Sequence, residues 1–205
     1  MTNQPTINLN SPPTMQYIPM VIDQSPHGDR AYDIFSRLLN ERIVFVAGQI
    51  HDMMANSIIA QLLYLQSKDA KKDIQIYINS PGGAAYAGLA IYDTIRHLNC
   101  EISTIAVGTA ASAATPLLAA GTKGKRYSLA HSLIHIHQPL GQAGGQASDI
   151  EIDAKEILRL RDSYAEILAK HTKKTQKQIL KDMDRDFYMT PDQAKVYGII
   201  DHVIK

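Results

Sequence analysis

Ser112 lies at a point in the sequence where chemistry could occur, in the stretch ISTIAVGTAASAATPLLAAG over residues 102–121. Residues 102–107 favour a β-strand, which Gly108 is expected to end, and a helix follows Ser112. A serine at a helix N-terminus lies among unpaired N–H groups that favour negative charge, so it can be a nucleophile whose oxyanion meets backbone donors. It can equally be a simple N-cap. The turn is not a G-x-S-x-G elbow, because alanines replace both glycines.

A histidine and a group of carboxylates could complete such a site. His137 ends a predicted strand, and DMDRD at residues 182–186 contributes three aspartates in a loop expected between two capped helices. A serine hydroxyl reacts when a base removes its proton, histidine is suited to this task near neutral pH, and a carboxylate fixes the histidine tautomer. The chain order serine, histidine, aspartate differs from those of chymotrypsin, subtilisin and the α/β-hydrolases. The spacing alone does not show which of the three aspartates would orient the histidine.

Other interpretations of these residues remain open. His135 and His137 face one side of a strand and could be a zinc pair, but zinc needs further ligands, and neither a helical H-x-x-x-H nor an additional cysteine supplies them. Asp182 and Asp184 are expected to be solvated loop charges. The turn at residues 81–83, Pro-Gly-Gly, is either a plain turn or a place where a substrate backbone approaches closely.

The composition is that of an ordinary globular protein, with 205 residues, 45% hydrophobic and 20% charged. The formal charge of +1 comes from interspersed residues, which does not indicate nucleic-acid binding. Cys100 is the only cysteine, which suits a reducing compartment. The uncharged run 102–122 contains many polar residues and Pro116, so we interpret it as a buried strand and helix rather than a membrane span. Neither a P-loop nor a dinucleotide-binding fingerprint is present, and no signal peptide is evident.

Strands and helices are expected to alternate along the chain, which predicts an α/β fold with a parallel sheet and crossover helices. Residues 1–19, which carry no charged side chain, are expected to form a flexible leader. Helices are expected at 29–42, 52–67, 86–98 and 150–170, with two short ones capped by Thr175 with Gln178 and by Thr190 with Gln193. Strands are expected at 43–46, 74–78, 102–107, 125–129, 133–136 and 199–204.

Many stretches of the chain, in the same order along the sequence, resemble the proteolytic subunits of Clp proteases, the ClpP family. The resemblance extends from about Ile18 to Lys205. These stretches are PMVID, YDIFSRLLNERIVFVAGQI, DIQIYINSPGG, AGLAIYDTI, VGTAAS, LLAAGTKGKRYSL, IHQPLG, GQASDIEIDAKEIL and DRDFYM. The resemblance implies a crotonase-like α/β fold of repeated β-α units. It also implies a single catalytic domain over residues 20–205 with a protruding handle at 141–170. Residues 1–19 would then be a propeptide and an axial-pore segment.

The resemblance also implies roles for individual positions. Ser112 matches the nucleophile, His137 the general base and Asp186 the orienting carboxylate, and no metal or cofactor is implied. The backbone N–H groups of Gly83 and Ala113 match the oxyanion hole. Further matches are Gly141, Gln142 and Ala143 for pairing with a substrate strand, Arg185 for an inter-ring contact, and Gln75, Tyr77 and His97 for a groove that receives a partner ATPase.

The function implied is that of a serine endopeptidase subunit that cuts unfolded polypeptides to short peptides. Cutting would take place in the chamber of two stacked heptameric rings, built from this chain alone or together with a paralogue. A separate AAA+ unfoldase would feed the chamber, in a bacterial cytoplasm or its organellar equivalent. No nucleic acid or membrane partner is implied.

Several positions depart from the family pattern and favour alternatives. They are Ala113-Ala114 in place of Met-Gly, Pro116 four residues after the nucleophile, Gln142 in place of a glycine, and Gln75 and His97 in place of aromatic residues. Pro116 could shift the turn and misplace Ser112. The alternative is a catalytically weak ring subunit that supports an active paralogue. A third interpretation is an acyl-CoA enzyme on the shared crotonase fold, in which the two N–H donors would hold a thioester enolate.

Overall fold

The computed structural model describes residues 18–23 and 28–205, so almost all of the expected leader lies outside the described residues. The first elements are β1 (Met20–Asp23), β2 (Arg30–Asp33), α1 (Ile34–Asn40), β3 (Ile43–Ala47), α2 (Asp52–Lys68), β4 (Ile74–Ser80), α3 (Ala85–His97) and β5 (Ile102–Ala111). They are followed by α4 (Ala114–Ala119), β6 (Arg126–Leu129), β7 (Leu133–Ile136), α5 (Ala147–His171), α6 (Gln176–Asp182), β8 (Phe187–Met189), α7 (Pro191–Tyr197) and β9 (His202–Ile204).

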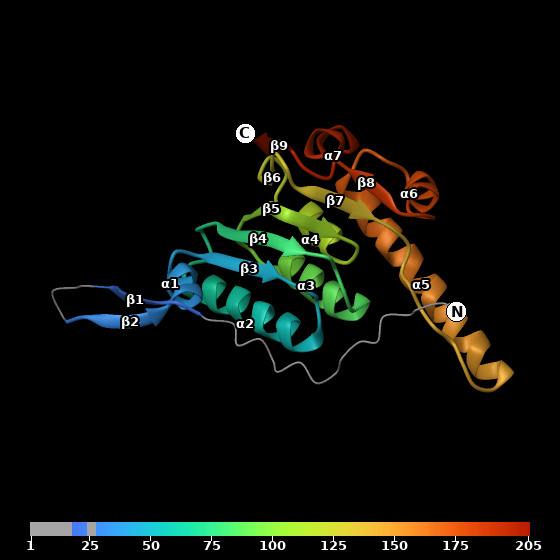
Figure 1. Ribbon diagram of the computed structural model, residues 1–205, viewed down its shortest axis with the longest axis horizontal. Coiled ribbons are helices and arrows are strands. Elements are labelled where there is room, and N and C mark those ends of the chain that lie inside the picture. The colour runs from blue at the N-terminus through green and yellow to red at the C-terminus, as the bar shows by residue number, and fades with distance from the viewer. Residues whose placement is uncertain (1–17, 24–27) are drawn as a thin grey trace, which may run out of the picture.

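The main sheet is mostly parallel, in the order β3-β4-β5-β6-β9, and β7 pairs with β5 in parallel and with β8 in antiparallel. Helices α2 and α3 cover one face of this sheet, and α5 extends away from the body (Figure 1). The chain thus has the expected α/β architecture, and the repeated β-α units bring the ends of β4, β5 and β7 close together.

The core lies between the sheet and the helices. Ile74, Ile76 and Ile78 alternate along β4 and are fully buried. Every residue of α4 is buried, as expected for the helix that follows the central strand. Fully burying an isoleucine contributes about 1.5–3 kcal/mol, so this packing fixes the positions of the strand ends. Among the described residues, no helix is both long and apolar enough to cross a membrane.

The central strand β5 does not end at Gly108, as the sequence predicted, but continues to Ala111. Gly108 has a φ of 83° and lies where the register between β4 and β5 shifts. The first part of β5 pairs with β6, at residues 104–106, and the last part pairs with β7, at residues 109–111. The glycine therefore produces a bulge in the strand, because both halves have pairing partners.

Several other local features differ from the expectations. The helix expected at 29–42 is β2 followed by α1, which begins after Asp33 because this side chain accepts a hydrogen bond from the Ser36 N–H. The loop expected around residues 182–186 leads into β8, and the last strand is limited to β9. The capping box at Thr190 is complete, whereas at Thr175 the Gln178 side chain donates to Asp182 instead.

Candidate active site

Ser112 occupies the turn between β5 and α4 in a left-handed conformation, with φ 54°. This backbone costs a serine on the order of 1–2 kcal/mol. Its N–H donates to the His135 carbonyl oxygen at 3.0 Å, and the hydroxyl of Thr115 lies 2.6 Å from the same oxygen. These bonds tie the turn to β7. Pro116 lies in the first turn of α4, where a proline is tolerated, and it does not displace Ser112 from His137.

Three side chains that are far apart in sequence meet at this turn. Nε2 of His137 lies 2.8 Å from Oγ of Ser112, within hydrogen-bond distance. Nδ1 of the same ring lies 3.3 Å from Oδ1 of Asp186. The nucleophile candidate thus comes from the end of β5, the histidine follows β7, and the aspartate precedes β8. A serine, a neutral imidazole and a carboxylate in this order can activate the hydroxyl for attack on a carbonyl carbon.

The structure distinguishes Asp186 from the other two aspartates. Pairing of β7 with β8 puts Ile136 opposite Phe187, so the residues just beyond them, His137 and Asp186, are neighbours. Asp184 is exposed. Asp182 is not a solvated loop charge as predicted, because it ends α6, is partly buried and accepts a hydrogen bond from the Tyr197 hydroxyl at 2.7 Å.

Asp186 has a second histidine partner that the sequence did not reveal. Nε2 of His135 lies 3.0 Å from the same Oδ1, and the His135 ring stacks on Tyr188 with centroids 4.4 Å apart. The His-x-His spacing predicted only that both rings share one side. Nδ1 or Nε2 of both histidines and an oxygen of Asp186 lie within 4.8 Å of one another. The carboxylate is thus a possible third ligand, one of those that the zinc interpretation lacked.

The surroundings of His137 favour its neutral form. Burial and the neighbouring His135 lower the pKa of His137 below its ordinary value of 6.5, although Asp186 acts in the opposite direction. The ring is therefore neutral at pH 7, and one nitrogen has a free lone pair for a proton. A base needs this protonation state.

Ser112 opens onto a pocket of about 400 Å³ that Gly83, Ala113, His137 and Leu140 help to line. Within the described parts of the chain, the N–H groups of Gly83 and Ala113 have no hydrogen-bond acceptor. The turn at residues 81–83 lies close to Ser112, and only a glycine fits at residue 82, since a Cβ at this position would lie 2.7 Å from Cβ of Ser112. Two unpaired donors beside a serine hydroxyl could bind an oxyanion.

The remaining predicted site residues lie elsewhere. Gly141, Gln142 and Ala143 are exposed, and their N–H and C=O groups bond to no other described residue. Arg185 is exposed and forms no ion pair with the part of the chain that is described. Their predicted roles are not tested by a single chain.

Two of the three residues that are predicted to line a partner groove lie on one face of the sheet. Gln75 and Tyr77 share one face of β4, and Tyr77 stacks on Phe45 with centroids 5.5 Å apart. His97 is exposed at the end of α3, and no hydrogen bond or ring contact links it to these two within the described residues. Its assignment to the groove remains a prediction.

The fold and the site together define an α/β protein whose mostly parallel sheet brings a serine, a histidine and an aspartate together, with the serine and the histidine lining one pocket. The family model described as Clp protease matches residues 26–205, which is nearly the whole chain. The chain therefore belongs to the Clp protease family, as the resemblance indicated, and this membership supports a peptidase of the Clp type.

Proposed function

We propose that the chain is the serine endopeptidase subunit of a Clp protease, with Ser112 as nucleophile, His137 as general base and Asp186 as orienting carboxylate. The observation that carries the proposal is the 2.8 Å separation between Oγ of Ser112 and Nε2 of His137. In the first step, His137 takes the hydroxyl proton while Oγ attacks the peptide carbonyl. The protonated ring then returns that proton to the leaving amine, and water releases the acyl group by the same route.

The oxyanion of the tetrahedral intermediate would be bound by the N–H groups of Gly83 and Ala113. Both residues line the pocket and both donors are unpaired within the described residues, which supports this role. One such donor is worth about 3 kcal/mol of transition-state stabilisation, because it is directed at charge that develops only during the reaction. Ala113 suffices in place of the usual methionine, since only its backbone takes part.

The substrate would be an unfolded polypeptide bound as an extended strand. The unpaired backbone of residues 141–143 supports this proposal, because such a segment can form main-chain hydrogen bonds with a peptide of any sequence. Gly141 approaches α5 closely, where a Cβ would lie 2.3 Å from Cδ1 of Ile157. Gln142 is exposed and free to turn away from a bound strand.

The assembly would be two stacked heptameric rings that enclose a chamber, fed by a separate AAA+ unfoldase. Arg185 would contact the opposite ring, and Gln75, Tyr77 and His97 would contribute to the groove for the unfoldase. Membership of the family and the exposure of Arg185, Gln75 and His97 support this proposal.

Ser112→Ala tests the chemistry. We expect this variant to lose peptide hydrolysis by about 10⁴- to 10⁶-fold, as when a nucleophile of this kind is removed, and to lose all labelling by a serine-reactive phosphonate. Ser57→Ala, at an exposed serine of α2, is the matched control and should be labelled like the wild type. Near-full hydrolysis by Ser112→Ala would refute the assignment.

Labelling of the isolated chain also addresses the alternative of a catalytically weak ring subunit. Stoichiometric labelling of Ser112 without a paralogue would argue against a purely structural role. Labelling that appears only when a paralogue is added would favour it. Thioesterase or hydratase activity that survives Ser112→Ala would instead favour an acyl-CoA enzyme.

A further inference from the structure

His135, His137 and Asp186 form a cluster whose second histidine the proposed peptide hydrolysis does not require. Oδ1 of Asp186 is 3.0 Å from Nε2 of His135 and 3.3 Å from Nδ1 of His137. Ligands at the usual zinc distances are about 3.4 Å apart in a tetrahedral site, so two of the three spacings already match. The most separated donor atoms, up to 4.8 Å apart, must approach each other by up to about 1.4 Å.

The surroundings of the cluster allow that adjustment. The Asp186 side chain is 58% exposed, so it can rotate, and it gives an ion a route from solvent. His135 is buried, and its ring is supported by Tyr188. Two imidazole nitrogens and one carboxylate oxygen suit a zinc-class ion, whereas Mg²⁺ and Ca²⁺ prefer oxygen ligands. Water could take the fourth position.

We propose that His135, His137 and Asp186 bind Zn²⁺ reversibly, and that the bound ion inhibits the reaction of Ser112. The ion takes the lone pair of Nδ1 of His137, and the proton on this nitrogen moves to Nε2. His135 binds through Nε2, and its proton moves to Nδ1. No electron is transferred, and each proton stays on its own ring.

Inhibition follows from the tautomer of His137. With Nδ1 bound to the ion and a proton on Nε2, the ring presents a donor to Oγ of Ser112 and cannot accept the hydroxyl proton. The hydroxyl remains in place but is no longer activated. This inhibitory effect depends on the proposed function, whereas binding of the ion does not.

Binding is measured first on full-length Ser112→Ala, which retains all three ligands. Calorimetric titration with ZnCl₂ should show one ion per chain that MgCl₂ does not replace, and Co²⁺ at the site should give the intense visible absorption of a tetrahedral complex. Adding His135→Gln, which keeps a hydrogen-bond donor toward Asp186, should weaken Zn²⁺ binding by roughly tenfold or more. Asp186→Asn, at a carboxylate that is 58% exposed, should do the same.

His131→Ala is the matched control, because His131 is exposed and lies outside the cluster. It should leave Zn²⁺ affinity unchanged. Affinity that is insensitive to both His135→Gln and Asp186→Asn would overturn the site and leave adventitious binding as the explanation.

Inhibition is measured as the rate of phosphonate labelling of the wild type. Saturating Zn²⁺ should slow labelling by roughly tenfold or more, and a chelator should restore it. Unchanged labelling with the ion bound would overturn the inhibitory role. If the wild type is never labelled, the proposed function fails, and the titration of Ser112→Ala still decides whether the site exists.

Discussion

At the scale of single residues, the proposed function makes the reactivity of Ser112 depend on the protonation state of His137. Burial and His135 lower the pKa of His137 below 6.5, so protonation is confined to acidic solution. Protonation removes the lone pair that would accept the hydroxyl proton. The carboxylate of Asp186 limits the lowering of the His137 pKa, because it favours the charged ring.

The rate of phosphonate labelling should therefore be constant near neutral pH and decrease on the acidic side, with a midpoint below pH 6.5. Below the midpoint, each pH unit should cost about tenfold, because one proton is involved. Labelling rates measured across pH in metal-free buffer test this, and circular dichroism confirms that the chain stays folded. A midpoint above pH 6.5 would contradict the assigned environment.

Gly82 determines how closely the turn at residues 81–83 approaches Ser112. Its φ is +91°, and a Cβ would lie 2.7 Å from both Cβ of Ser112 and the Ala111 carbonyl oxygen. Gly82→Ala should displace the serine by a fraction of an ångström or more. Labelling should then slow by about a hundredfold, since a small displacement of a reacting group greatly lowers its reaction rate.

Gly124→Ala is the matched control for this prediction. Gly124 has a similar φ of +89°, but nothing lies within 4 Å of the added Cβ. It should lose about 1 kcal/mol of stability through backbone strain and keep the wild-type labelling rate. Equal labelling by both variants would show that the turn adapts without moving Ser112.

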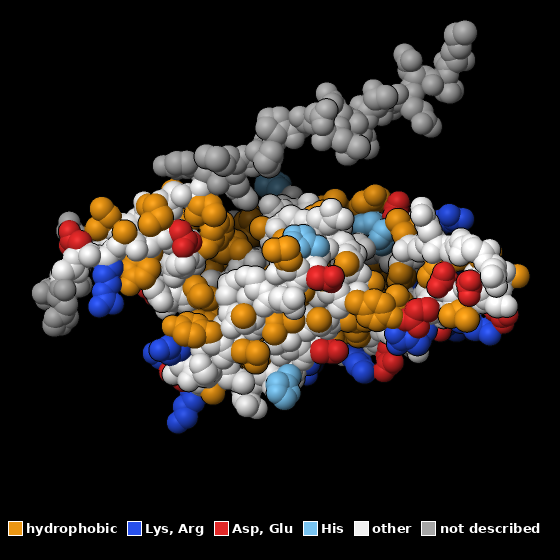
Figure 2. Space-filling model, turned by 90° about the horizontal axis from the view of Figure 1, so that it is seen from below, with side chains coloured by type: hydrophobic (Ala, Val, Ile, Leu, Met, Phe, Trp, Pro, Cys, Tyr) orange, Lys and Arg blue, Asp and Glu red, His pale blue; other side chains and the backbone are white. Residues whose placement is uncertain are grey.

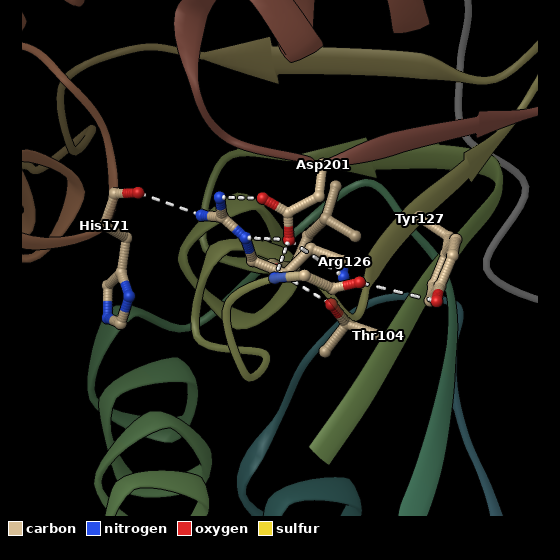
Figure 3. A network of polar contacts seen from close by, with 7 residues as sticks. Thr104, Arg126, Tyr127, His171 and Asp201 are labelled. Atoms are coloured by element: carbon tan, nitrogen blue, oxygen red, sulfur yellow. Dashed lines mark hydrogen bonds and ion pairs between the residues drawn. The ribbon is translucent and has the colours of Figure 1, made fainter. Parts of the chain in front are cut away.

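At the scale of elements, a buried ion pair joins β6, the end of α5 and the segment before β9 (Figure 3). Nε and Nη2 of Arg126 donate to the two oxygens of Asp201 at 2.9 and 2.7 Å. Nη1 of Arg126 donates to the His171 carbonyl at 2.9 Å. One side chain thus joins three segments that meet only in the folded chain.

Asp201→Ala should lower the free energy of unfolding by about 3–5 kcal/mol, because it leaves the guanidinium of Arg126 buried without its counter-ion. Urea denaturation measures the loss. Glu151→Ala is the control, since its pair with Lys155 is 67–71% exposed and should cost at most about 1 kcal/mol. A similar cost for both variants would mean that water reaches Arg126 easily. The double variant Arg126→Met with Asp201→Leu should be less destabilised than Asp201→Ala.

At the scale of the whole molecule, α5 has a buried half and an unburied half. All its buried residues lie from Leu160 onward, whereas Ile150, Ile152 and Leu158 are 42–63% exposed. With 25 residues the helix is about 37 Å long, and its first half extends beyond the body (Figure 1). Figure 2 shows hydrophobic side chains scattered over the face seen from below. Charged side chains gather on the right, toward the projecting end of α5. Exposed apolar residues on a projecting helix are typical of a subunit interface.

Ile152→Asp should therefore shift the proposed assembly toward smaller species, because a charge would be buried where the first half of α5 would contact another subunit. Native mass spectrometry and light scattering after size-exclusion chromatography measure this shift. Val196→Asp is the control, at a residue of α7 that is 85% exposed. An unchanged mass for Ile152→Asp would exclude this part of α5 from the interface.

Much of this organisation could be predicted from the sequence, because the signals are local. The spacing of apolar residues predicted α2, β4, α3 and β7 to within about two residues, a periodicity that neighbouring residues alone determine. The same local signals put Ser112 between a strand and a helix, and His137 at a strand end. Where local signals were ambiguous, at Gly108 and around residues 29–42, the predictions were wrong.

Contacts between distant segments were decided only by the tertiary structure. The choice of Asp186 among three aspartates depends on the register of β7 against β8, and β8 was not predicted. The second bond of Asp186, to His135, and the close approach of Gly82 to Ser112 depend on how separate strands end side by side. Register and strand order arise from packing of the whole core, so no window of the sequence contains them.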